Sequence, residues 1–214
     1  MTLHSARAFI GSKLHPAGLV PHLPPKGAQP VSFFGAGSEI YAQGESAGGL
    51  YEVEFGCVRI YRLLADGRRQ ISAFHFAGEI FGFEASGTHH FFAEAIVSSG
   101  IRLIRSNPSP DGCHEILPFA LQNLVRAQEH LLLLGRQNAV ERVAAFLADM
   151  AERQGGLEHI DLPMSRTDIA DYLGLTIETV SRVFSRLKQK GVIRLHGARS
   201  VEIERMEVLR AMAE

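Results

Sequence analysis

Residues 164–188 place the strongest constraint on how this chain folds, because a glycine divides two short amphipathic segments that each begin at a capping residue. Ser165 can cap the first helix, and Asp168 three places later completes a capping-box pattern with an acid at the positive helix end. Gly174 supplies the tight turn that follows. Thr176 can cap the second helix. The stretch therefore predicts a helix-turn-helix.

The second helix has two faces of different chemistry. Four apolar residues with the spacing of a buried face are Val180, Val183, Phe184 and Leu187. The opposite face carries Glu178, Ser181 and Arg182. Arg182 can bond guanine O6 and N7 together, and Glu178 can accept from cytosine N4. A recognition helix enters the major groove with its N-terminal residues first, so this face is predicted to read DNA bases. An intrahelical Glu178–Arg182 pair can coexist with that role.

A hairpin is predicted directly after this helix, which Gly191 is placed to end. Two short apolar runs, 192–195 and 200–203, flank a turn at 196–198, and they predict a winged helix. Between residues 163 and 200, seven basic and three acidic residues give a local charge of +4, whereas the whole chain carries −1. Phosphate binding requires such a local patch. The predicted DNA-backbone contacts are Ser165, Thr176, Thr179, Ser185, Arg186, Lys188 and Arg199.

The N-terminal half has the composition of a β domain. Short runs of strand-forming residues broken by glycine predict strands at Leu50–Val53, Val58–Tyr61, Ile71–Phe74 and Phe91–Val97, with a hairpin turn at residues 65–68. Strands at this spacing favour a β-roll of jelly-roll type over residues 31–112. Residues 1–30 are rich in proline and glycine and are predicted to form a flexible arm.

Residues 113–150 change to a helical pattern. The heptad spacing of Ala120, Leu124, Ala127, Leu131 and Leu134 predicts an apolar seam. This seam indicates a dimerisation helix at 113–137 and a homodimer, although a helix of the core would have the same pattern. Residues 138–214 then form the winged helix-turn-helix domain. The whole chain is predicted to be an α+β protein.

Composition excludes several classes of protein. No apolar run approaches the ~20 residues that span a bilayer, and no secretory signal is visible, so a cytoplasmic protein without membrane contact is expected. Cys57 and Cys113 are too few for a disulfide framework or a four-thiolate iron–sulfur cluster. No metal-ligand spacing, nucleophile elbow or phosphate loop is present. The sequence therefore predicts no enzyme activity, no metal and no cofactor.

Residues 38–204 resemble the superfamily of the catabolite activator protein and the fumarate–nitrate reduction regulator. The stretch Leu173–Arg182 is similar to the recognition motif of the fumarate–nitrate branch, and this resemblance implies that Glu178, Ser181 and Arg182 read a TTGA half-site of a palindrome. Within the branch, Asp66–Gln70, Gly82–Ala85 and further segments resemble the FixK group of nitrogen-fixation regulators. The resemblance implies a dimeric activator that recruits RNA polymerase at genes of low-oxygen respiration, nitrogen fixation or denitrification.

The resemblance leaves the sensor function open. Relatives that bind cyclic nucleotides hold the phosphate with an Arg-Ser pair, where this chain has Thr88–Phe92, so cyclic-nucleotide binding is not expected. A regulator that senses a gas or small ligand through haem or a pocket in the β-roll, where His75, His89 and His90 lie, is also compatible with the sequence. The sequence further admits an enzyme that uses the acids of the β domain, and a winged helix that binds a partner protein instead of DNA.

Overall fold

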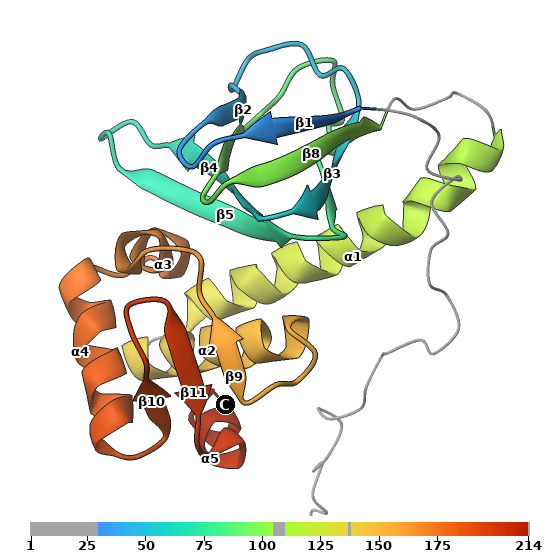
Figure 1. The fold of residues 1–214 in the computed structure, drawn as a ribbon. Helices are drawn as coiled ribbons and strands as arrows, with labels where there is room; N and C mark the ends of the chain where they lie inside the picture. The colour runs from blue at the N-terminus through green and yellow to red at the C-terminus, as the bar shows by residue number, and fades with distance from the viewer. Residues whose placement is uncertain (1–29, 105–109, 137, 214) are drawn as a thin grey trace, which may run out of the picture.

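The computed structural model describes residues 30–104, 110–136 and 138–213 (Figure 1). The predicted arm at residues 1–30 lies outside these ranges except for Pro30. Within them, no helix is long and apolar enough to cross a membrane. An N-terminal β domain stands above a long helix, and a helical domain with a small sheet lies below it.

Two antiparallel four-stranded sheets form the β domain and confirm the predicted β-roll. Their strand orders are β1-β8-β3-β6 and β2-β7-β4-β5. The strands are β1 (Val31–Phe34), β2 (Glu39–Tyr41), β3 (Leu50–Phe55), β4 (Cys57–Leu63), β5 (Arg69–Phe76), β6 (Ile80–Phe81), β7 (Phe92–Ala95) and β8 (Ser99–Ile104). The predicted strands correspond to β3, β4, β5 and β7. The sequence did not predict β1, β2, β6 and β8.

Aromatic rings fill part of the interior of the roll. The ring of His89 stacks on Tyr41 with 3.6 Å between ring centroids, and Tyr51 stacks on Phe81 at 5.3 Å. Tyr41, Phe81 and His89 are all buried. Burial raises the pKa of the Tyr41 hydroxyl far above its usual range. These rings pack as core.

Helix α1 (Pro110–Gly135) connects the β-roll to the C-terminal domain, which begins with α2 (Ala139–Arg153). Helix α1 begins three residues before the predicted start at Cys113 and ends two before the predicted end at residue 137. It packs against the roll: Leu133 is buried, and the Asn123 amide donates to the carbonyl of Ile80 at 3.0 Å. Helix α1 therefore packs in the interface between the domains, and it also carries the residues of the predicted seam.

The C-terminal domain is a winged helix-turn-helix, as predicted. Helices α3 (Arg166–Leu173) and α4 (Ile177–Gln189) are followed by the hairpin β10 (Ile193–Leu195) and β11 (Ser200–Ile203). The sequence missed β9 (His159–Asp161), which completes a three-stranded sheet of order β10-β11-β9, and the final helix α5 (Met206–Ala213). The predicted apolar face of α4 is buried, with each of its four residues at most 6% exposed.

Candidate nucleic-acid interface

The start of α3 is fixed by the predicted capping box. The Ser165 hydroxyl accepts from the Asp168 N–H at 3.1 Å, and the Asp168 carboxylate accepts from the Ser165 N–H at 3.0 Å. Gly174 ends the helix with φ +61°, a left-handed conformation that side chains with a Cβ disfavour. These two features set the turn that presents α4.

The predicted base-reading residues lie together on the exposed face at the start of α4. The Thr176 hydroxyl accepts from the Thr179 N–H at 3.3 Å and caps the helix, and Glu178, Ser181 and Arg182 are exposed beyond it. The Arg182 guanidinium donates to the Thr179 hydroxyl at 3.2 Å. Hydrogen bonds from the helix start hold the pKa of Glu178 below its usual range, first from its own backbone N–H and then from Thr176. The face therefore presents an ionised acceptor and a cationic fork side by side.

The predicted phosphate contacts lie at the starts of α3 and α4, along α4 and in the turn of the wing. Ser165, Thr176, Ser185, Arg186, Lys188 and Arg199 are exposed, and Thr179 is half-buried. The Ser185 hydroxyl donates back to the Ser181 carbonyl at 3.0 Å. Arg186 and Lys188 lie in the last turn of α4, at the end opposite the base-reading residues. Their predicted role in phosphate binding stays a prediction.

Arg166 has a packing role that the sequence did not reveal. Its guanidinium carbon lies 3.4 Å from the centroid of the Phe184 ring, so Arg166 joins the start of α3 to the core face of α4. Burial lowers the pKa of this guanidinium to about 10, which leaves it charged at neutral pH. Arg166 therefore contributes to α3–α4 packing more than to the exposed basic patch.

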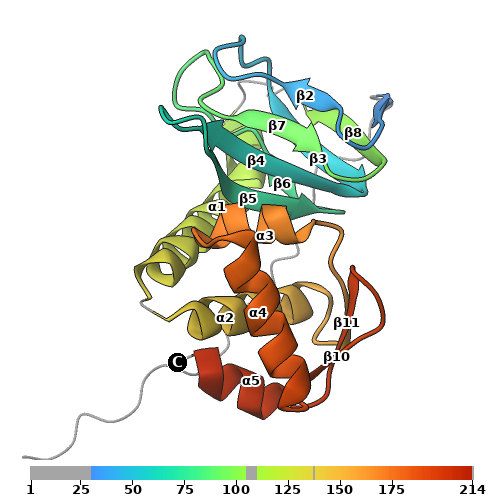
Figure 2. The same ribbon diagram turned by 90° about the vertical axis from the view of Figure 1, so that its left-hand side faces the viewer.

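The acids of α3 face the β-roll rather than the candidate DNA face, a feature that sequence reasoning missed. Helix α3 lies directly below β5 (Figure 2). Asp168 accepts from Arg59 at 2.7 Å and from Arg69 at 2.6 Å, and Asp171 accepts from Arg69 at 2.9 Å. Two of the three acids in segment 163–200 are thereby paired across the domain interface. Among those three acids, only Glu178 is exposed on the α4 side.

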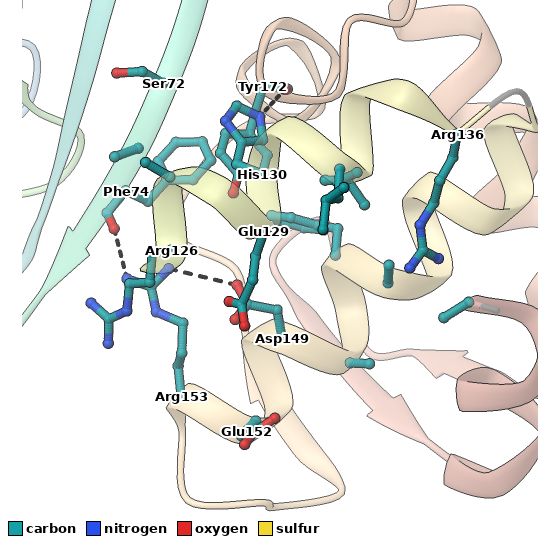
Figure 3. A pocket seen from close by; sticks show the side chains of 18 of the residues that line it. Ser72, Phe74, Arg126, Glu129, His130, Arg136, Asp149, Glu152, Arg153 and Tyr172 are labelled. Atoms are coloured by element: carbon teal, nitrogen blue, oxygen red, sulfur yellow. Dashed lines mark hydrogen bonds and ion pairs between the residues drawn. The ribbon is translucent and has the colours of Figure 1, made fainter. Parts of the chain in front are cut away.

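A cavity of about 490 Å³ lies between β5, α1 and α2 (Figure 3). Two of the residues that line it, His130 and Tyr172, stack at 3.9 Å between ring centroids, and a His130 ring nitrogen lies 2.8 Å from the Tyr172 carbonyl oxygen. Beside it, Arg126 and Arg153 each lie 2.8 Å from the Glu79 carboxylate. Burial alone would raise the pKa of Glu79, but a His75 hydrogen bond and these two arginines lower it to about 2. Arg126, Arg153 and Glu79 thus form an ion-pair cluster across the domain interface.

The loop before β7, where cyclic-nucleotide relatives carry their Arg-Ser pair, is occupied by internal contacts. The Glu84 carboxylate accepts from the His90 backbone N–H at 3.0 Å and lies 2.6 Å from a His90 ring nitrogen. A ring nitrogen of His89 lies 3.3 Å from the same carboxylate. His75, the third candidate haem ligand, lies 3.5 Å from Glu79. Each of these histidines thus lies beside a carboxylate.

The thiol chemistry of the described part of the chain is limited to one buried residue. Cys57 is 1% exposed, and burial raises the pKa of its thiol above the usual range. A buried protonated thiol is a poor nucleophile and a poor metal ligand. The side chain of Cys113 lies outside the described residues. Val183 is buried in the core of the helix-turn-helix.

Comparisons with known proteins agree with this architecture. Residues 141–212 match the model of the Crp-like helix-turn-helix domain, and residues 31–107 match the cyclic nucleotide-binding domain. The chain is 52% identical over 196 residues to the nitrogen fixation regulation protein FixK of Rhizobium meliloti, with 90% of this chain and 93% of that protein covered. It is 41% identical to FixK of Azorhizobium caulinodans, over 84% and 77% of the two chains.

A solved structure is also similar to this chain over most of the length of both proteins. FixK2 of Bradyrhizobium japonicum superposes with a TM-score of 0.81 at 39% identity, and the match covers 87% of this chain and 98% of that one. The β-roll, the long helix and the winged helix-turn-helix therefore occur in the same order in a solved relative.

Proposed function

The chain belongs to the FixK group of the Crp/Fnr transcription regulators and is a DNA-binding regulator of FixK type, and from that membership we propose that it reads TTGA-type palindromes as a homodimer. The observation that carries the proposal is the exposed face at the capped start of α4, where Glu178, Ser181 and Arg182 stand together. Arg182 pairs with guanine, and Glu178 accepts from the cytosine amine.

The relatives are named as nitrogen fixation regulation proteins, which supports a proposal for the regulated genes. We propose that this chain activates genes of nitrogen fixation, denitrification or low-oxygen respiration by recruiting RNA polymerase in the cytoplasm, and that it catalyses no reaction. The proposal includes binding by the unliganded protein, so that its activity follows the amount of protein made.

Fluorescence anisotropy of the purified, unliganded protein tests the proposed binding. A duplex with a TTGA–TCAA palindrome is compared with a scrambled duplex of the same composition, in air and at a fixed salt concentration, because phosphate contacts make affinity depend on salt. Tight binding that prefers the palindrome supports the proposal. Equal affinity for the two duplexes contradicts it.

The exposed face of α1 supports the proposed homodimer. Large apolar side chains 51–73% exposed would be unfavourable on a monomer, and on this helix they include Leu117, Leu121, Leu124, Val125, Leu131 and Leu132. Of the predicted seam, Leu124, Ala127 and Leu131 are exposed. Ala120 and Leu134 are half-buried, and Leu134 lies beside Gly174 of the helix-turn-helix. These exposed apolar side chains thus form a stripe along α1 that is centred a little to one side of the predicted seam.

Leu131→Glu is expected to convert the dimer to a monomer, since it places a charge in the apolar contact between the two helices. Leu131 is 73% exposed within one chain, so the fold of the subunit should survive. Sedimentation equilibrium measures the change in mass, and Gln122→Glu, on an exposed position outside the stripe, is the matched control. A variant that remains dimeric would place the interface elsewhere.

A further inference from the structure

Three side chains with metal-donor atoms meet on the sheet of the C-terminal domain. His159 lies on β9, Glu202 on β11, and His196 in the turn after β10. Their donor atoms all lie within 4.8 Å of one another, and among the residues described here no other three His, Cys, Asp or Glu side chains do so. We propose that these three side chains bind one divalent transition-metal ion of the Zn²⁺ class.

The backbone brings the ligands together. His159 and Glu202 are direct partners in the antiparallel pairing of β9 with β11, so their side chains project from the same face of the sheet. The turn between β10 and β11 is closed by a hydrogen bond from the His196 N–H to the Ser200 carbonyl at 3.1 Å, and it places His196 beside them. Three separate segments thus contribute one ligand each.

The present distances are close to those of a metal site. A His196 ring nitrogen lies 2.8 Å from a Glu202 carboxylate oxygen, and the rings of His159 and His196 are 4.8 Å apart at their centroids. Ligands around a tetrahedral Zn²⁺ lie roughly 3.3–3.6 Å from one another, given metal–ligand bonds of about 2.0–2.2 Å. Both histidines are exposed, so modest side-chain rotations can close the remaining gap.

The chemistry of the donor set favours a transition metal over Mg²⁺ or Ca²⁺. Imidazole nitrogen suits Zn²⁺, Cu²⁺ and Ni²⁺, whereas the hard cations require mostly oxygen ligands. Two histidines and one carboxylate leave a fourth position to water. Arg194 contacts the same Glu202 oxygen at 3.3 Å, but it also pairs with Glu204 at 2.6 Å. The Glu202 carboxylate can therefore turn to a metal without leaving Arg194 unpaired.

Such a site would join the wing hairpin to β9. The three ligands come together only in the folded domain, so metal binding should stabilise it by mass action. The site uses none of the residues proposed to read bases or contact phosphate. Metal binding is therefore measured without DNA, and its failure would not bear on the proposed function.

Isothermal titration calorimetry with Zn²⁺ tests the site on untagged, metal-free, full-length protein. One Zn²⁺ per chain is expected, with no heat from Mg²⁺. His159→Gln and His196→Gln should each weaken Zn²⁺ binding at least about 10-fold. Loss of an outer-shell partner of a metal ligand lowers metal affinity about 10–100-fold, and loss of the ligand itself should lower it no less. His114→Gln replaces an exposed histidine of α1 and should bind as the wild type does.

Two results would overturn the site. One is the absence of Zn²⁺ binding to the wild-type protein at a hundred-micromolar concentration. The other is wild-type affinity in both His159→Gln and His196→Gln, which would assign any bound zinc to different residues, such as Cys113. Circular dichroism of each variant checks that the domain is folded, so a lost affinity reports the ligand itself.

Discussion

Arg182→Ala is expected to remove most of the preference for the guanine of each TTGA half-site while leaving the fold intact. Arg182 is exposed and its one hydrogen bond in the structure goes to Thr179 on the same helix turn, so truncation opens no cavity. A bidentate arginine–guanine pair contributes ~1–3 kcal/mol of discrimination, which corresponds to roughly 5- to 150-fold in relative affinity at each half-site.

Anisotropy titrations measure this loss with the palindrome and with a duplex in which the guanine is replaced. The wild type should separate the two duplexes, and Arg182→Ala should bind them almost equally. Lys188→Ala is the matched comparison because Lys188 is an exposed cation of the same helix, at the end away from the proposed base-reading face. It should weaken binding to both duplexes alike and reduce the salt dependence. If Arg182→Ala keeps the wild-type preference, a different face of α4 reads the bases.

The helix-turn-helix could be predicted from sequence because its signals are local. A cap, a glycine with positive φ and an apolar face at helical spacing are each set by residues a few positions apart, and Ser165, Gly174 and Thr176 all have the predicted geometry. The same holds for the turn at residues 65–68, where Gly67 has φ +82° and its N–H donates to the Leu64 carbonyl at 2.9 Å.

The missed elements depend on partners far away in the chain. Strand β1 pairs with β8, which places Val31 opposite Arg102, and neither segment has a turn signal that announces the pairing. Strands β6 and β9 have two and three residues, too few for an alternating pattern to stand out. Their existence is set by the sheets that they join.

Only the part of the candidate site that depends on nearby residues could be predicted from the sequence. Local periodicity separated the exposed and buried faces of α4, but the pairing of α3 with the β-roll joins residues about a hundred positions apart. Asp168 already had a complete local role as the acid of a capping box, so nothing in the sequence called for a second partner. The cluster of His159, His196 and Glu202 likewise depends on β9, which was not predicted.

Asp168→Ala is expected to be among the most destabilising substitutions in the chain. Asp168 is 3% exposed, and both of its oxygens are in use: one accepts from Arg59 and Arg69, the other from the backbone and hydroxyl of Ser165. Removing one partner of a buried ion pair costs ~3–5 kcal/mol. The Ser165 hydroxyl still caps the helix in this variant because it accepts from the backbone N–H of residue 168, so only the carboxylate half of the capping box is lost. Arg59 keeps Glu94 at 2.5 Å, so the lower end of this range is expected.

Urea unfolding followed by helical circular dichroism measures this change. Asp168→Asn should fall between the alanine variant and the wild type, because an amide can still accept from Ser165 but no longer carries the charge that faces the two arginines. Asp171→Ala is the matched control. Its side chain is 24% exposed and it pairs with Arg69 alone among the β-roll arginines, so we expect a loss below ~1 kcal/mol. If Asp168→Ala shifts the urea midpoint no further than Asp171→Ala, these ion pairs do not hold the DNA-binding domain against the β-roll.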